Sequence, residues 1–153
     1  MGPKFIKSKN IRGFQIASPS IMGLRCVNVV IDMIYRAGMA AIVDKAQKGT
    51  EIMIAFYDEW LEKLGFRLMT PREKAKRGGH ISLMHESARN ISVALRNYEN
   101  TIVDFREPNQ IRIAISPLAM TYSELHEGLK RIRNVAESKS FEKIENFDGK
   151  KIY

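Results

Sequence analysis

Residues 106–117 read REPNQIRIAISP, and this stretch predicts a turn followed by a short strand. Pro108 fixes its own φ and lacks an N–H donor, and a Pro-Asn-Gln run is typical of a turn. Three isoleucines then alternate with Arg112, Ala114 and Ser116, which is the period of a half-buried strand. We therefore expect Arg112 to point away from the core. There it is either a solvated edge residue or a guanidinium that holds an anion.

The composition is that of a globular protein with a strongly basic balance. The chain has 153 residues, 44% of them hydrophobic, and a formal net charge of +8. This length suffices for one domain with a core. The charge fits a polyanion, an acidic protein partner, or a basic surface with no partner. Lysines and arginines are spread from Lys4 to Lys151 and do not cluster, which argues against a nucleic-acid partner.

The sequence argues against an intrachain disulfide, a zinc site, a membrane span and a signal peptide. The single cysteine, Cys26, excludes an intrachain disulfide and points to a reducing compartment, so we expect a cytoplasmic protein. Three histidines with one cysteine give no zinc spacing, so no metal is expected. No apolar run reaches membrane-spanning length, and the basic N-terminus lacks the apolar stretch of a signal peptide.

The N-terminal half predicts two helices. Ser18-Pro19 is a helix-start signal, with Ser18 as the N-cap and Pro19 at the first helical position. This helix runs to about residue 36 and is apolar on more than one face, so we expect it to be buried. A long second helix spans residues 39–64, with Gly49 inside it and Gly65 as its C-terminal stop. We expect the apolar faces of these two helices to pack against a neighbouring domain.

The C-terminal half predicts a small α/β (α+β) domain in the order β-β-α-β-β-α, a sheet with its helices on one face. Thr121 and Glu124 form a capping box at the start of the last helix. The expected elements are strands 66–69, 80–84, 102–105 and 111–115, and helices 86–97 and 121–138. The expected division is a lead-in arm 1–17, a domain 18–138 (helices 18–64, sheet domain 66–138) and a loose tail 139–153.

The usual catalytic constellations are absent from the sequence. No glycine-rich phosphate motif joins a strand to a helix, and no serine nucleophile elbow is present. The basic run 72–77 is interpreted as a solvated loop, Gly78-Gly79 as a turn, and His85 as an exposed residue or a local cap. Ser18 is either a plain N-cap or a hydroxyl that meets an anion at a helix N-terminus.

Several of these motifs, taken in order, resemble the C-terminal part of kynureninase. The resemblance runs from about Ile11 to Val135 and rests on ASP (17–19), RGGHIS (77–82) and DFREPNQIR (104–112), followed by SPL at 116–118. Kynureninases are homodimeric, pyridoxal-phosphate-dependent hydrolases of the aspartate aminotransferase fold type. They cleave kynurenine to anthranilate and alanine in tryptophan catabolism.

The resemblance implies roles for two residues. Arg112 matches the arginine that binds the substrate α-carboxylate, and Ser18 matches a position near the cofactor phosphate, contributed across the dimer interface. The lysine that binds pyridoxal phosphate belongs to a large domain with no counterpart here. We therefore expect no catalytic residue in this chain and no activity from it alone. A large-domain chain or a homodimer partner would complete the site.

Two other functions fit the same sequence. One is a non-catalytic binding module whose basic surface attracts an acidic protein or a nucleic acid. The other is a dimerisation module built on the two N-terminal helices.

Overall fold

The computed structural model describes residues 6, 8–15 and 17–144, and these form two compact units that divide after Ala37. The first unit contains a short 3-10 turn, Ile11–Phe14, and the helix α1, Ile21–Ala37. No residue of α1 is buried, and its exposed side chains include Ile21, Met22 and Val29. The predicted burial of this helix is therefore not found within the described residues.

The second unit is a mixed α/β domain, as predicted, with a four-stranded antiparallel sheet. Its helix α2 continues from Phe56 through a π-helical turn, Tyr57–Leu61, and a 3-10 turn, Glu62–Leu64. Gly65 then ends the run in the left-handed conformation (φ 87°), as its position in the sequence predicted. The remaining bounds are α2 Met39–Phe56, β1 Arg67–Leu68, β2 His80–Met84, α3 Ala88–Glu99, β3 Asp104–Arg106, β4 Gln110–Ala114 and α4 Tyr122–Glu137.

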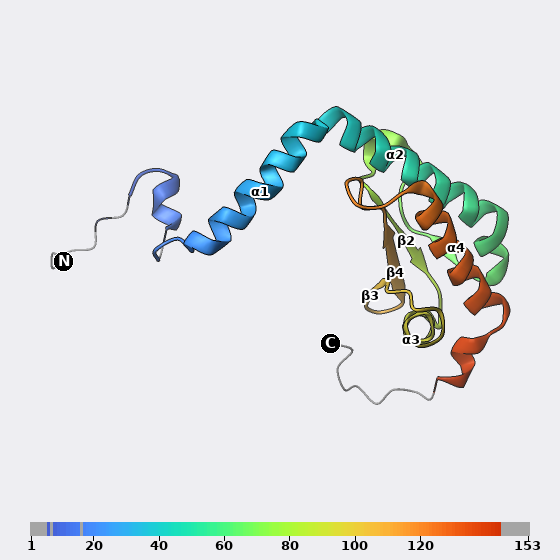
Figure 1. Cartoon of the computed structure of the whole chain (residues 1–153). Coiled ribbons are helices and arrows are strands. Elements are labelled where there is room, and N and C mark those ends of the chain that lie inside the picture. Colours follow the sequence, from blue (N-terminus) through green and yellow to red (C-terminus); the bar gives the residue numbers. More distant parts are fainter. Residues whose placement is uncertain (1–5, 7, 16, 145–153) are drawn as a thin grey trace. The chain divides into compact units, whose positions relative to one another are not determined.

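The sheet has the strand order β1-β2-β4-β3, and each neighbouring pair is antiparallel. Ile81 lies opposite Ile113 and Leu83 opposite Ile111 in the central β2–β4 pair. All four side chains are buried, and the apolar faces of α2, α3 and α4 complete the core with them. Figure 1 shows these three helices beside the sheet. The alternate residues of the same strands form the other face of the sheet, which no described helix covers.

Local sequence signals explain several of these bounds. The predicted capping box is confirmed, because the Thr121 hydroxyl accepts from the Glu124 amide and the Glu124 carboxylate accepts from the Thr121 amide. Gly49 does not break α2, and it lies against Ile115: a Cβ added there would come within 2.7 Å of Cγ2 of that side chain. This glycine therefore allows close packing of the helix on the segment after β4.

Two expected features differ from the structure. The predicted N-cap at Ser18 is wrong, because the amide of Gly23 donates to the hydroxyl of Ser20 at 3.1 Å and α1 begins at Ile21. Ser18 and Pro19 thus precede the helix. The segment expected as a loose tail forms a 3-10 turn over Ser140–Lys143, with Phe141 buried in the core.

Parts of the expected arm and tail lie outside the described residues, namely 1–5, 7, 16 and 145–153. Within the described part of the expected lead-in arm, residues 11–14 form a 3-10 turn and Gln15 is extended. Within the described chain, no helix on its own is long and apolar enough to cross a membrane. Ile21–Ala37 and Met39–Leu64 reach that length and composition only when they are counted as a pair.

Candidate functional site

Arg112 lies in the middle of β4, on the face of the sheet that the helices leave uncovered. Ile111 and Ile113 on either side of it are buried, whereas its own side chain is 37% exposed. The predicted alternation along this strand is therefore confirmed. In the register of the sheet Arg112 lies between Ser82 of β2 and Asp104 of β3.

Arg112 is not a lone guanidinium, because it forms an ion pair with the facing Asp104. Its Nε donates to Asp104 Oδ2 at 2.8 Å, and its Nη2 donates to the same oxygen. The Arg112 and Arg106 guanidiniums hold the pKa of the Asp104 carboxyl below its usual value, and Arg112 contributes most. This partner of Arg112 was not predicted from the sequence. Counting residues outward from the turn at Pro108 would have identified Asp104, because residues 104 and 112 lie opposite each other in the hairpin.

Polar side chains surround the pair on the same sheet face. The Ser82 hydroxyl, opposite Arg112, donates to Oε1 of Gln110 at 2.7 Å. Arg106 reaches Asp104 Oδ2 from the far side, with its Nε and Nη2 both at 3.1 Å. This face thus presents two arginines around one carboxylate.

A groove of about 270 Å³ opens beside this ion pair, between β3, β4 and α4. Arg112 and Asp104 contribute to its lining, together with mainly apolar side chains that include Ile102, Met120 and Leu129. Charged and apolar surfaces therefore meet next to Arg112. Such a border suits a ligand that has an acidic group and an apolar body.

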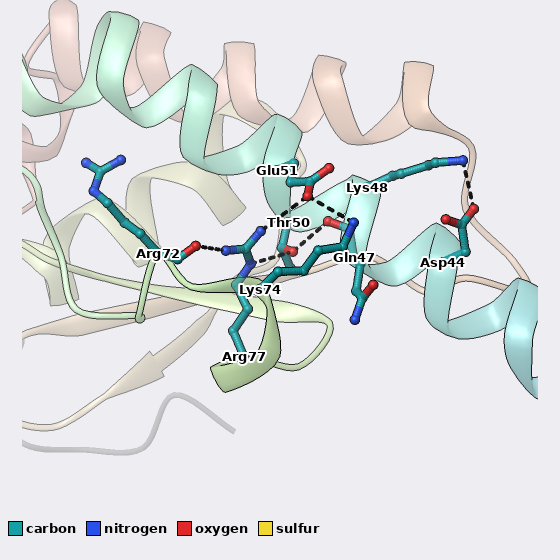
Figure 2. Close-up of polar contacts among 8 residues, drawn as sticks. All are labelled: Asp44, Gln47, Lys48, Thr50, Glu51, Arg72, Lys74 and Arg77. Carbon is teal, nitrogen blue, oxygen red and sulfur yellow. Dashed lines mark hydrogen bonds and ion pairs between the residues drawn. The ribbon is translucent and has the colours of Figure 1, made fainter.

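A second polar centre fixes the loop 70–79 onto α2 (Figure 2). The Arg77 side chain is only 3% exposed. Its Nε donates to the hydroxyl of Thr50 at 3.0 Å, its Nη1 donates to the carbonyl of Arg72, and its Nη2 lies 3.7 Å from a Glu51 carboxylate oxygen. The interpretation of 72–77 as a solvated loop is therefore wrong for Arg77, while the side chains of Arg72, Lys74 and Lys76 are exposed.

His85 acts as a local cap, one of the two alternatives predicted for it. Its Nδ1 accepts from the amide of Ser87 at 3.0 Å, and its ring lies between Phe66 and Phe141, with centroids 4.7 and 5.7 Å away. Burial lowers the pKa of this imidazole. The other predicted site residue, Ser18, is exposed.

The described residues do not fit the reactive centre of a pyridoxal-phosphate enzyme. A lysine that forms an imine is typically desolvated, and no described lysine is buried. The described part of the chain also holds no cluster of three or more histidine, cysteine or acidic residues that could bind a metal. What the described residues do present is a guanidinium, that of Arg112, beside an apolar groove.

The kynureninase C-terminal domain profile matches residues 42–132 of this sequence. This range is more than half of the chain and holds the whole sheet. The chain belongs to the kynureninase family. A kynureninase of Geobacillus thermodenitrificans is 30% identical over 143 residues, which are 93% of this chain and 33% of the relative. A kynureninase of Bacillus thuringiensis is 31% identical over 133 residues, or 87% of this chain and 31% of the relative.

The chain thus spans about a third of the length of the kynureninases that it matches. Arg77, Asp104 and Arg112 all lie within the residues that match the kynureninase C-terminal domain, and Ser18 lies before them. The family resemblance expected from the sequence is confirmed over the sheet domain.

Proposed function

We propose that this chain is the C-terminal, small-domain part of a kynureninase-like hydrolase of the aspartate aminotransferase fold type. In this proposal Arg112 binds the α-carboxylate of the substrate. The observation that carries it is the place of Arg112 within the family match, where it lines a largely apolar groove between β3, β4 and α4. A planar guanidinium with parallel N–H donors suits a carboxylate.

The proposed reaction is the cleavage of kynurenine to anthranilate and alanine. Pyridoxal phosphate supplies the electron sink for this chemistry when it is bound. The part of a kynureninase that this chain does not span, on the same or another polypeptide, would carry the lysine that holds the cofactor. The role of this chain is to orient the substrate through Arg112. We also propose that Ser18 contacts the cofactor phosphate across a subunit boundary. Ser18 is exposed, and Ser20, not Ser18, caps α1.

The helix α1 supports a proposal about partners. Its exposed side chains include Leu24, Val27, Val30, Ile31 and Met33, each at least half exposed. An exposed apolar surface of this kind marks an interaction site. We propose that a pyridoxal-phosphate-binding domain covers it.

The test is to mix the purified chain with a polypeptide that spans the other two thirds of the Geobacillus thermodenitrificans kynureninase. Pyridoxal-phosphate absorbance and kynurenine loss are then followed. We expect turnover in the mixture and none from either component alone. A mixture that neither associates nor consumes kynurenine would contradict the proposal, as would turnover by the chain alone.

The same exposed helix favours a second candidate, a non-catalytic dimerisation module. In that case the apolar side chains of α1 would pair with those of a second copy. Light scattering separates the two candidates. A stable homodimer that does not bind the large-domain polypeptide would favour the dimerisation module.

A further inference from the structure

The geometry points to Asp104 as a positioning residue that leaves one edge of the Arg112 guanidinium open, so that Arg112 takes a single carboxylate end-on. This inference rests on the proposed carboxylate-binding role of Arg112 and specifies how that role is performed. Asp104 then belongs to the site because it positions Arg112, although it does not touch the substrate itself.

The two edges of the Arg112 guanidinium have different surroundings. A guanidinium offers a side-on edge, made of Nε and one Nη, and an end-on edge, made of both Nη atoms. Asp104 Oδ2 accepts from Nε at 2.8 Å and from Nη2, which together form the side-on edge. Nη1 has no hydrogen-bond partner among the described residues. The end-on edge therefore remains open for a carboxylate.

The ion pair also fixes the direction in which this open edge points. Arginine has a long side chain whose rotamer freedom costs free energy when a ligand immobilises it. Asp104 is directly opposite Arg112 in the β3–β4 register, so the pair is anchored on adjacent strands and not on a loop. The Arg112 guanidinium is consequently held in place before any ligand arrives.

Charge balance indicates the class of ligand. Arg106 donates to the same Oδ2 atom from Nε at 3.1 Å, and its Nη2 lies 3.1 Å away. Two guanidiniums and one carboxylate give the cluster a net charge of +1. An aspartate carboxyl is ionised at neutral pH, and the two guanidiniums lower the pKa of Asp104 further, so this balance is maintained. Glu124 also lines the groove, but its carboxylate already accepts from the amide and the hydroxyl of Thr121. The net charge of +1 on the arginine cluster therefore matches one carboxylate, and a second acidic group on the ligand would find no further positive charge there.

The alternative is that Asp104 blocks Arg112 and must leave before an anion can bind. The two cases differ in which guanidinium nitrogens respond to a carboxylate. The experiment is therefore nitrogen-15 and carbon-13 NMR of the full chain, with acetate as the probe and chloride at equal ionic strength as the reference.

We expect acetate to shift the Arg112 Nη signals and to leave Arg112 Nε and the Asp104 carboxyl carbon unchanged. In Asp104→Asn, which keeps the shape of the side chain and removes its charge, we expect acetate to shift Nε as well. Glu137→Gln is the matched control, because it removes the charge of a carboxylate whose oxygen lies 2.7 Å from the Nε of Arg133 on α4. It should leave the Arg112 response as in the wild type.

Two results would overturn the inference while leaving the carboxylate role of Arg112 in place. In one, acetate shifts Nε and the Asp104 carboxyl together in the wild type, which means that Asp104 is displaced. In the other, only Asp104→Asn responds, which means that Asp104 blocks the site. A response at Arg112 in neither protein would contradict the inference and the carboxylate role together.

Discussion

Arg77 donates from Nε to the hydroxyl of Thr50 at 3.0 Å, and Thr50 has no exposed surface. The Thr50 hydroxyl in turn donates to the carbonyl of Gln47 at 2.8 Å. One arginine thus joins the loop before β2 to the interior of α2 (Figure 2). The loop leads into β2, which pairs with β4 and its Arg112, so this contact supports the strand pairing beneath the candidate site.

We predict that Arg77→Ala lowers the free energy of unfolding by about 1.5–3 kcal/mol, because it removes hydrogen bonds that a buried charged group makes. Urea denaturation measures this loss. The matched control is Arg72→Ala, since the Arg72 side chain is 58% exposed and pairs with Asp58 at the surface. That substitution should cost about 1 kcal/mol or less. Equal losses for the two variants would show that the Arg77 contacts contribute nothing beyond a surface ion pair.

Gly49→Ala should destabilise the chain although alanine favours helices. The added Cβ would lie 2.7 Å from Ile115 Cγ2, and overpacking of this kind costs about 1–3 kcal/mol. Gly128→Ala on α4 is the control, because a Cβ there meets no atom within 4 Å. We expect that variant to gain up to about 1 kcal/mol from helix propensity. Thermal unfolding of both variants checks the opposite signs, and a stabilised Gly49→Ala would contradict the close packing.

The ordered domain continues past its expected end at residue 138. Phe141 is buried against the core and lies next to His85, so Phe141→Ala should cost about 3 kcal/mol or more. A chain that ends at residue 138 should lose a similar amount, whereas one that ends at residue 144 keeps Phe141 in place. Urea midpoints of these chains provide the comparison. Equal midpoints for the chains ending at 138 and 144 would be evidence against the packing of this turn.

The stability of the domain should fall with acid through His85. Burial lowers its folded-state pKa below the ordinary value of 6.5, so the unfolded chain binds the proton first. This contribution is therefore complete above pH 6.5 and is lost as the pH falls from there through the lower folded-state pKa.

Two measurements check this prediction. NMR titration of the His85 ring should give a midpoint below 6.5. Urea midpoints of His85→Gln should vary less with pH than those of the wild type just below that value. A His85 midpoint at or above 6.5 would contradict the account of its burial.

The sequence was most informative where periodicity and local chemistry decide the structure. The alternation around Arg112 predicted which strand residues are buried, and the Thr121–Glu124 pair predicted how α4 begins. Both signals depend on residues close together in the chain.

The features that the sequence did not reveal depend on contacts between distant segments. Arg77 is buried because the loop folds back onto α2, and no local pattern separates it from its exposed neighbours in the run 72–77. By contrast, the partner of Arg112 is near it in the sequence, and the register across the turn at Pro108 would have shown it. Ser18 and Ser20 both precede an apolar run, and only backbone geometry shows that Ser20 is the cap.

The central claim is that Arg112 binds the carboxylate of the substrate in an active site whose other residues come from the large domain. The most direct test is kcat/KM for kynurenine in the mixture with the large-domain polypeptide, comparing wild type, Arg112→Lys and Arg112→Gln. We predict that kcat/KM falls about tenfold or more for Arg112→Gln. The fall should be intermediate for Arg112→Lys, which keeps the positive charge but lacks the parallel N–H donors of a guanidinium. An Arg112→Gln mixture that turns over kynurenine as fast as the wild-type mixture would contradict the claim.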